Sequence, residues 1–472
     1  MRCNMTISTK FFRLFQKSYR KFIASKFSSI QIIVTYYVIL TLIALLLFSL
    51  PIFRQPNSDV PLIDLIFMAI STVSVTGLST FDIHTVFNQY GVILLEVLFQ
   101  VGGFGIMMIS TFFFIISKRK ITLRQRQLIM TDMNQPRLSG VVRLIKRTLI
   151  ILISLQIFFG LAFGTYFYLN NDFATIRESL FWGIFQSVSA VTNSGFDVTG
   201  ESLLPFAQHN SFLLWIMLLM FIGSIGFPVL LETTDFVSYQ FQKKRLPYRF
   251  SLFTKIAVTS FLVLFIVGGI VIYNFENNHL YQFMGTPEKV LNAFFYSMST
   301  RNAGLQINHL SDFQPNTLLF MSVLMFIGAS PSSVGGGIRT TTVAIVFLYL
   351  IAFLKGETNV NLFGRRIDQS DIQKSVVVLN LSLIFCFAAV LILMATQPSL
   401  SMISIVVEVA SAFGTTGLSL GITDQLDTIG KITIALLMFI GRVGTLYILM
   451  LFVPKQTRDL GYEYPSEKII IG

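Results

Sequence analysis

Four short polar segments, each containing a glycine, interrupt an otherwise apolar chain. They read TVSVTGL at 72–78, AVTNSGF at 190–196, TRNAGL at 300–305 and FGTTGL at 413–418. Glycine adopts backbone conformations that other residues avoid, so it can turn carbonyl oxygens to one side and let the backbone approach a ligand. A ring of backbone carbonyls can replace the hydration shell of a monovalent cation. The chemistry that these segments offer is therefore cation coordination.

We expect the four segments to meet around one axis and to form an ion selectivity filter. A single segment alone would favour a glycine turn in an ordinary helix bundle, and the fourfold recurrence is what favours a filter. The predicted filter residues are Thr72, Val73, Ser74, Val75, Thr76, Gly77, Val191, Thr192, Asn193, Ser194, Gly195, Thr300, Arg301, Asn302, Ala303, Gly304, Phe413, Gly414, Thr415, Thr416 and Gly417.

The elements that must position these segments recur as well. The pentapeptide LMFIG occurs at 219–223, 324–328 and 437–441, with a looser LFQVG at 98–102. A short apolar stretch precedes each polar segment, at 61–71, 175–189, 286–299 and 401–412. A bilayer crossing needs about 20 apolar residues, so we expect these stretches to be half-membrane pore helices. Their negative C-terminal ends then point at the axis.

The composition is that of a membrane protein. Of the 472 residues, 53% are hydrophobic and only 12% are charged, with a mean hydropathy of +0.71, which is too apolar for an ordinary soluble globule. The predicted fold is an all-α polytopic membrane protein of four pseudo-repeated helix, pore helix, filter loop and helix units around one central ion pathway. Eight spans are expected, at 30–50, 90–116, 147–169, 211–231, 253–275, 317–328 with 340–354, 375–396 and 431–453.

The repeats divide the chain into six parts. These are a basic N-terminal segment (1–28), pore repeat 1 (29–120), pore repeat 2 (121–245), pore repeat 3 with a broken second helix (246–357), pore repeat 4 (358–453) and a short tail (454–472).

Charge is distributed unevenly along the chain, which carries a net charge of +12. Cations gather before the first span and in alternate loops at 118–146, 243–249 and 365–374, whereas the other loops are acidic. The positive-inside rule then places both termini in the cytoplasm of a cell (plasma) membrane protein. This topology accounts for the basic balance, so nucleic-acid binding is not indicated. The four histidines lack metal-ligand spacing, and the two cysteines predict no disulfide.

The filter glycines, the VTGL and TRNAGL segments and 328 GASPSSVGGGIRTTT 342 resemble the Trk/Ktr/HKT superfamily of potassium transporters, and are most similar to its KtrB-type membrane subunits. The resemblance covers about residues 30–453. It implies K⁺ as the transported ion and the only metal at the filter. Plant-type relatives that favour sodium often carry serine at the first filter glycine, which is Gly77 here, so the resemblance also implies a preference for potassium.

The third repeat departs from the others after LMFIG. Pro331 and three successive glycines cannot sustain a straight helix, so the span must break within the membrane, and the resemblance implies that the broken segment is a gate. The other possible roles are a helix break that matters only for packing and a phosphate loop, although GxxxxGK[ST] is absent. The predicted gate residues are Gly328, Ala329, Ser330, Pro331, Ser332, Ser333, Gly335, Gly336, Gly337 and Arg442.

Two arginines lie where charge is costly. Arg442 falls within the last span, where it must face protein or water. The resemblance places it beside the gate as a barrier to cations, and the alternative is that it bonds backbone carbonyls to hold the bundle. Arg301 precedes Gly304 by three residues and is expected to brace the filter from behind, with Glu408 as a candidate partner.

The expected function is potassium uptake, gated by the intramembrane loop. The electrochemical gradient can drive this uptake without ATP hydrolysis, and no covalent cofactor is expected. Sodium either activates or is co-transported. The resemblance implies a homodimer and a cytoplasmic nucleotide-binding regulatory ring of the KtrA type. The alternatives are a sodium- or proton-coupled potassium symporter and, remotely, an intramembrane enzyme. The spans contain no histidine and no paired aspartates, which argues against the enzyme.

Overall fold

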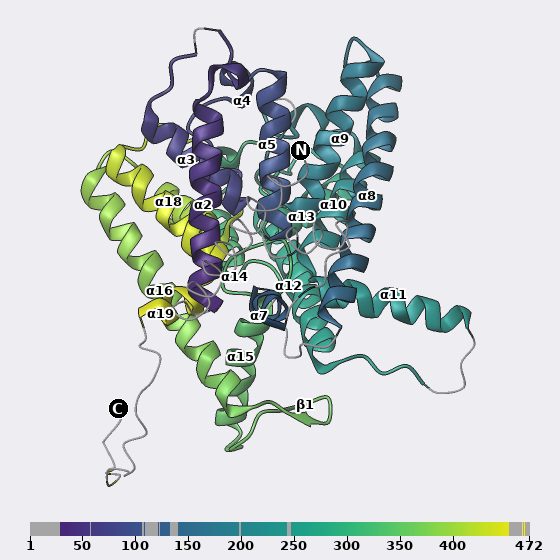
Figure 1. Cartoon of the computed structure of the whole chain (residues 1–472), viewed down its shortest axis with the longest axis vertical. Coiled ribbons are helices and arrows are strands. Elements are labelled where there is room, and N and C mark those ends of the chain that lie inside the picture. Colours follow the sequence, from purple (N-terminus) through teal and green to yellow (C-terminus); the bar gives the residue numbers. More distant parts are fainter. Residues whose placement is uncertain are drawn as a thin grey trace, which may run out of the picture.

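The computed structural model describes residues 29–56, 58–105, 108, 121, 123–132, 140–197, 200–242, 247–452, 465 and 467. The predicted N-terminal segment 1–28 lies outside these residues, as do nearly all of the tail 454–472 and most cations of the loops at 118–146 and 243–249. The described part is a helical bundle with a small hairpin of β1 (Asn361–Leu362) and β2 (Arg365–Arg366) (Figure 1).

The same order of elements occurs four times, and we call the sets units 1 to 4. The first helices are α2 (Ser29–Ser49), α8 (Val141–Leu169), α12 (Leu252–Glu276) and α16 (Gln369–Thr396). The pore helices are α3 (Leu62–Ser74), α9 (Ile176–Thr192), α13 (Thr286–Ser299) and α17 (Met402–Gly414). The second helices are α5 (Gln89–Phe104), α10 (Asn210–Ser224), α14 (Pro315–Ile327) and α18 (Thr428–Val443).

The remaining elements connect or extend these units. Short helices in the connections are η1 (Pro51–Phe53), α4 (Ile83–Val86), α7 (Leu123–Asp132), η2 (Leu204–Phe206) and η3 (Leu310–Asp312). The second helices of units 2 to 4 are followed by α11 (Phe227–Phe241), α15 (Thr340–Leu354) and α19 (Thr445–Phe452). In Figure 1, α11 projects sideways from the bundle, and α15 and the hairpin extend below it.

The four first helices are each long and apolar enough to cross a membrane. Two bent helix pairs, α10 with α11 and α18 with α19, raise the number of possible spans among the described residues to six if each pair counts as one. The second helices α5 and α14 are shorter apolar helices. The helices are therefore those of a polytopic membrane protein.

The second helices end earlier than the sequence predicts. The apolar runs at 211–231 and 431–453 predict straight spans, and this is wrong: the chain bends by 107° between α10 and α11 and by 97° between α18 and α19. Gly226 and Gly444 at these bends have φ of 103° and 100°, which no helix accommodates. Gly105 (φ 81°) and Gly328 (φ 67°) end α5 and α14 in the same way. The helix break predicted for unit 3 alone thus has a counterpart in the other units.

The units are arranged in a circle. The second helix of each unit packs against the pore helix of the next: α5 on α9, α10 on α13, α14 on α17, and α18 back on α3. A partly buried ion pair joins units 4 and 1, since Lys431 Nζ lies 2.6 Å from Asp64 Oδ1 and the two side chains are 13% and 11% exposed. The four pore helices therefore face a common interior.

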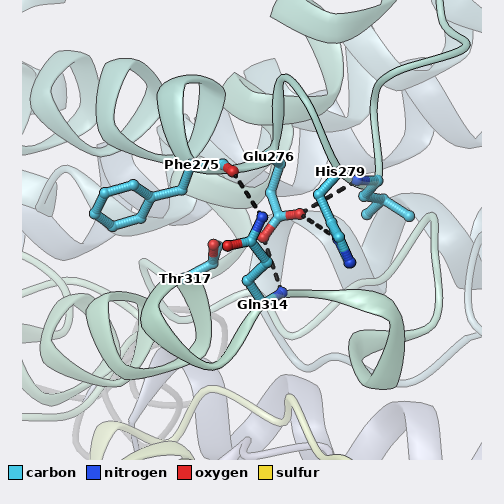
Figure 2. A network of polar contacts seen from close by, with 6 residues as sticks. Phe275, Glu276, His279, Gln314 and Thr317 are labelled. Atoms are coloured by element: carbon cyan, nitrogen blue, oxygen red, sulfur yellow. Dashed lines mark hydrogen bonds and ion pairs between the residues drawn. The ribbon is translucent and has the colours of Figure 1, made fainter.

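A buried carboxylate fixes the geometry of unit 3 (Figure 2). Glu276, at the end of α12, is fully buried and accepts hydrogen bonds from the Gln314 amide (3.0 Å) and the Thr317 hydroxyl at the start of α14. Its second carboxylate oxygen lies 3.2 Å from His279 Nδ1. These contacts tie the outer ends of the first and second helices together, so the pore helix and polar segment between them are held at both ends.

Candidate ion pathway

Three of the pore helices end in the same way. Val75, Asn193 and Thr415 follow α3, α9 and α17 and adopt left-handed conformations, with φ of 60°, 52° and 51°. In unit 3 the turn comes later, at Asn302, where φ is 97°. A left-handed residue ends a helix and redirects the chain, so each polar segment leaves its pore helix toward the centre of the circle.

The four predicted filter glycines lie against one another. Gly77, Gly195, Gly304 and Gly417 all have positive φ, between 68° and 95°. A Cβ on Gly77 would lie 2.4 Å from the Ser194 carbonyl oxygen, and one on Gly304 would lie 2.0 Å from that of Thr416. We call these four residues the glycine ring.

The remaining contacts close the glycine ring. A Cβ on Gly195 would lie 3.2 Å from the Ala303 carbonyl oxygen, and one on Gly417 would lie 2.3 Å from that of Thr76. Each glycine thus touches the next unit in the order 1, 2, 3, 4 and 1 again. The four polar segments thus lie against one another at these glycines. A Cβ would come within 2.4 Å of a backbone oxygen at Gly77, Gly304 and Gly417, whereas Gly195 leaves slightly more room.

The other predicted filter residues lie in or beside the same segments. Thr72 to Ser74, Val191 with Thr192, and Phe413 with Gly414 still belong to the last turns of their pore helices. Asn302 links units 3 and 4, because its Nδ2 donates to the carbonyl (2.9 Å) and the hydroxyl (2.8 Å) of Thr415.

Sequence reasoning missed a set of serines that hold the polar segments in shape. Ser189 bonds the Ser194 hydroxyl (2.8 Å) and donates to the Phe196 carbonyl (2.5 Å), on either side of Gly195. Ser299 donates to the Leu305 carbonyl at 2.6 Å. In unit 4, Ser411 accepts from the Gly417 amide (3.0 Å), and Ser71 stands at the matching position of unit 1. The signal was a serine five or six residues before each ring glycine.

A cavity of 580 Å³ lies beside the glycine ring, and all four ring glycines line it. Four carboxylates also line it: Asp82, Asp197, Glu201 and Asp424. Negative charge in a cleft raises the local concentration of cations. His84 and His309 share this lining, and His309 is exposed. The described residues contain no cluster of His, Cys, Asp and Glu side chains that could hold a metal ion.

The segment 328–339 lies beneath the glycine ring and is mostly buried. A Cβ on Gly335 would meet Asn302, and one on Gly336 would meet Thr415, so the segment presses on the inner side of the polar loops of units 3 and 4. It also reaches unit 2, where Ser330 N donates to the Ser224 carbonyl at 3.0 Å. The predicted gate residues of the loop are thus brought together below the ring.

Arg442 connects this segment to unit 1. Its side chain is 7% exposed, and its guanidinium donates to the carbonyls of Val334, Gly102 and Gly103, the last at 2.9 Å. Arg442 therefore bonds backbone carbonyls, as one of the two sequence interpretations expects, and one of these carbonyls belongs to the predicted gate segment.

Arg301 does not contact the residue expected to be its partner. Glu408 instead accepts from Ser419 (2.7 Å) and Thr423 (2.6 Å). Arg301 is fully buried, its guanidinium forms no hydrogen bond within the described part of the chain, and it lies 5.3 Å from the centre of the Phe261 ring on α12. The prediction of Glu408 as partner is wrong because Glu408 is satisfied within its own unit.

Four pore helices arranged around a ring of glycine-bent loops define a channel-like cation transport protein. The TrkH family model, described as "Cation transport protein", matches residues 5–459. The chain belongs to this family, whose members are transporters and not enzymes.

Relatives of known name cover almost the whole chain. The Ktr system potassium uptake protein D of Bacillus subtilis is 44% identical over 94% of this chain and 97% of its own. The potassium/sodium uptake protein NtpJ of Enterococcus hirae is 34% identical, covering 96% and 99%. The crystal structure of the potassium transporter TrkH from Vibrio parahaemolyticus matches with a TM-score of 0.71 over 91% of this chain and 86% of that one, at 16% identity, which supports the fold.

Proposed function

We propose that this chain is the membrane subunit of a potassium uptake system and that K⁺ passes through the glycine ring. The observation that carries the proposal is the cyclic contact of Gly77, Gly195, Gly304 and Gly417, which gathers the carbonyls of four units at one place. The uptake of potassium by the Bacillus and Enterococcus relatives, as their names state it, supports the choice of ion.

The path runs from the acidic outer cavity through the ring to the segment 328–339. The four carboxylates concentrate cations, the ring carbonyls replace their water, and the segment opens or closes the inner side. Eight passes with both termini in the cytoplasm place the acidic cavity outside. An inside-negative potential then contributes about 2.3 kcal/mol per charge per 100 mV, which drives uptake without a bound cofactor.

Control by a separate cytoplasmic protein fits the inner surface. Arg365 and Arg366 of the hairpin are exposed, and an acidic face of a KtrA-type nucleotide-binding ring is complementary to them. The membrane subunit acts as a homodimer in this proposal. Sodium acts as an activator or is co-transported, which the name of the Enterococcus relative favours.

The test is uptake of rubidium-86 into proteoliposomes that hold the purified chain, with unlabelled K⁺ or Na⁺ as competitor. Gly77→Ser places an atom against the Ser194 carbonyl and forces a non-glycine residue to φ 88°. We expect the preference for K⁺ over Na⁺ as competitor to fall about tenfold, which corresponds to about 1.4 kcal/mol.

Gly356→Ser is the matched control. Gly356 also has a positive φ of 73°, but nothing lies within 4 Å of a Cβ there, so the same substitution strains the backbone away from the path. Its preference for K⁺ should equal that of the native chain. An unchanged preference in Gly77→Ser would mean that the ring does not select the ion.

A further inference from the structure

A second cavity, of 170 Å³, lies on the inner side of the segment 328–339, between α2, the start of α11 and the junction of α18 with α19. Arg339 and Arg442 both line it, and none of its described lining residues is an aspartate or a glutamate. Two cations without a carboxylate make this cavity a poor resting place for K⁺. Its electrostatics favour an anion.

The guanidinium groups of Arg339 and Arg442 have N–H donors that the hydrogen bonds described here do not use. The hydrogen bonds of Arg442 use its Nη atoms, which leaves its Nε buried and without a partner in the described structure. Arg339 donates from Nη1 to the Gly335 carbonyl. A buried donor without an acceptor is destabilising, so an acceptor placed here is favourable.

The cavity is also lined by the beginning of α19, at Gly444 to Tyr447. The first amides of a helix have no intrahelical acceptor, and Thr445 and Leu446 donate no backbone hydrogen bond within the described residues. A helix N-terminus favours anions, and phosphate in particular. The amides at the start of α19 and the two arginines therefore line one small space.

We propose that this cavity binds one tetrahedral oxyanion of the phosphate class. Planar guanidinium groups bind such oxygens in pairs, and the bound anion links the start of α15, through Arg339, to the end of α18 and the start of α19. This link holds the segment 328–339 in the arrangement described, with the inner side closed. The effect on flux rests on the proposed function, whereas the binding does not.

The binding test is isothermal titration calorimetry of the full chain in detergent, in chloride buffer at fixed pH, with inorganic phosphate as the probe. We expect one phosphate per chain, and Arg339→Gln should weaken its binding about tenfold or more. Arg339→Lys keeps the charge without the planar fork and should be intermediate. Arg366→Gln, which removes an exposed arginine outside the cavity, should bind as the native chain does.

A parallel titration with dihexanoyl phosphatidic acid distinguishes the source of the phosphate group. If only the lipid binds, and Arg339→Gln weakens it, the ligand is a headgroup. If inorganic phosphate binds, it is the free ion. The absence of binding in both titrations of the native chain, or equal binding by native chain and Arg339→Gln, overturns the proposal without any need for the variant to transport.

The consequence for transport is measured by rubidium-86 uptake with phosphate on the inner face. Uptake by the native chain should fall as phosphate rises, and uptake by Arg339→Gln should fall much less. Phosphate that binds without changing uptake overturns the closing role. A native chain that binds phosphate but carries no cation contradicts the proposed function and leaves the anion site standing, so the two failures can be told apart.

Discussion

A serine hydroxyl near the end of a pore helix shapes the polar segment that follows it. Ser189 is fully buried and holds both Ser194 and the Phe196 carbonyl, so Gly195 is fixed from both sides. Such contacts decide where carbonyl oxygens point, although the serine itself touches no ion. If the ring selects the ion, as proposed, its selectivity depends on residues outside it.

Ser189→Ala tests this role. The substitution leaves the Ser194 hydroxyl and the Phe196 carbonyl buried without this partner, and we expect a loss of about 1–3 kcal/mol in the free energy of unfolding together with weaker discrimination against Na⁺. Thermal unfolding in detergent and competition in rubidium uptake measure the two effects. Ser238→Ala is the control, since this exposed hydroxyl bonds only the carbonyl of Thr234 in its own helix. Equal behaviour of the two variants would show that Ser189 is dispensable.

Arg301 shows that the contact partner of a single residue cannot be predicted from the sequence around it. Its position three residues before Gly304 predicts that it braces the proposed filter from behind, and its side chain is fully buried behind the polar segment of unit 3, against α12. Its contact with Phe261 comes from α12, about 40 residues earlier in the chain, so neither charge nor spacing indicates it. A long-range partner of this kind depends on how helices pack, and periodicity carries no such information.

At the scale of elements, the pore helices could be predicted and the helix breaks could not. The stretch 286–299 coincides with α13, because length and flanking residues decide where a short apolar helix lies. The bend at Gly226 stands within the apolar run 211–231, and a glycine in such a run is compatible with a straight helix until its φ is known. Breaks at Gly105 and Gly444 escaped prediction for the same reason.

The ion pair between α3 and α18 is expected to hold the circle of units closed. Asp64→Asn leaves Lys431 partly buried without a charged partner, and because both side chains keep some exposure we expect a loss of about 1–3 kcal/mol in stability. The double variant Asp64→Asn with Lys431→Met should recover part of that loss. Thermal unfolding provides the measurement.

Asp371→Asn gives the comparison for this pair. Asp371 lies 3.3 Å from Lys374, and the side chains are 57% and 52% exposed, so this surface pair contributes less than about 0.5 kcal/mol. If Asp64→Asn is no more harmful than Asp371→Asn, the contact between units 4 and 1 is maintained by apolar packing and the ion pair contributes nothing measurable.

At the scale of the whole molecule, charged side chains gather at two places. Carboxylates line the larger cavity beside the glycine ring, and the exposed Arg365 and Arg366 stand on the hairpin. Two roles are proposed for the hairpin arginines: they help to set the topology through the positive-inside rule, and they offer an acidic partner a docking surface. These two roles make different predictions, because topology is set during insertion whereas docking acts on the folded protein.

Reversing both hairpin charges, Arg365→Glu with Arg366→Glu, separates the roles. We expect binding of the cytoplasmic regulatory ring to weaken about tenfold or more at low salt, and the native interaction to weaken as salt rises because exposed charges are screened. Rubidium uptake by the chain alone should be unchanged, since the hairpin lies outside both cavities.

Pull-down of the regulator by the detergent-solubilised chain, over a series of salt concentrations, measures the weakened binding. Arg177→Glu reverses an exposed charge in the first turn of the pore helix of unit 2, away from the hairpin, and should bind the regulator normally. Equal binding by the hairpin variant would leave the basic inner face with a role in membrane insertion alone.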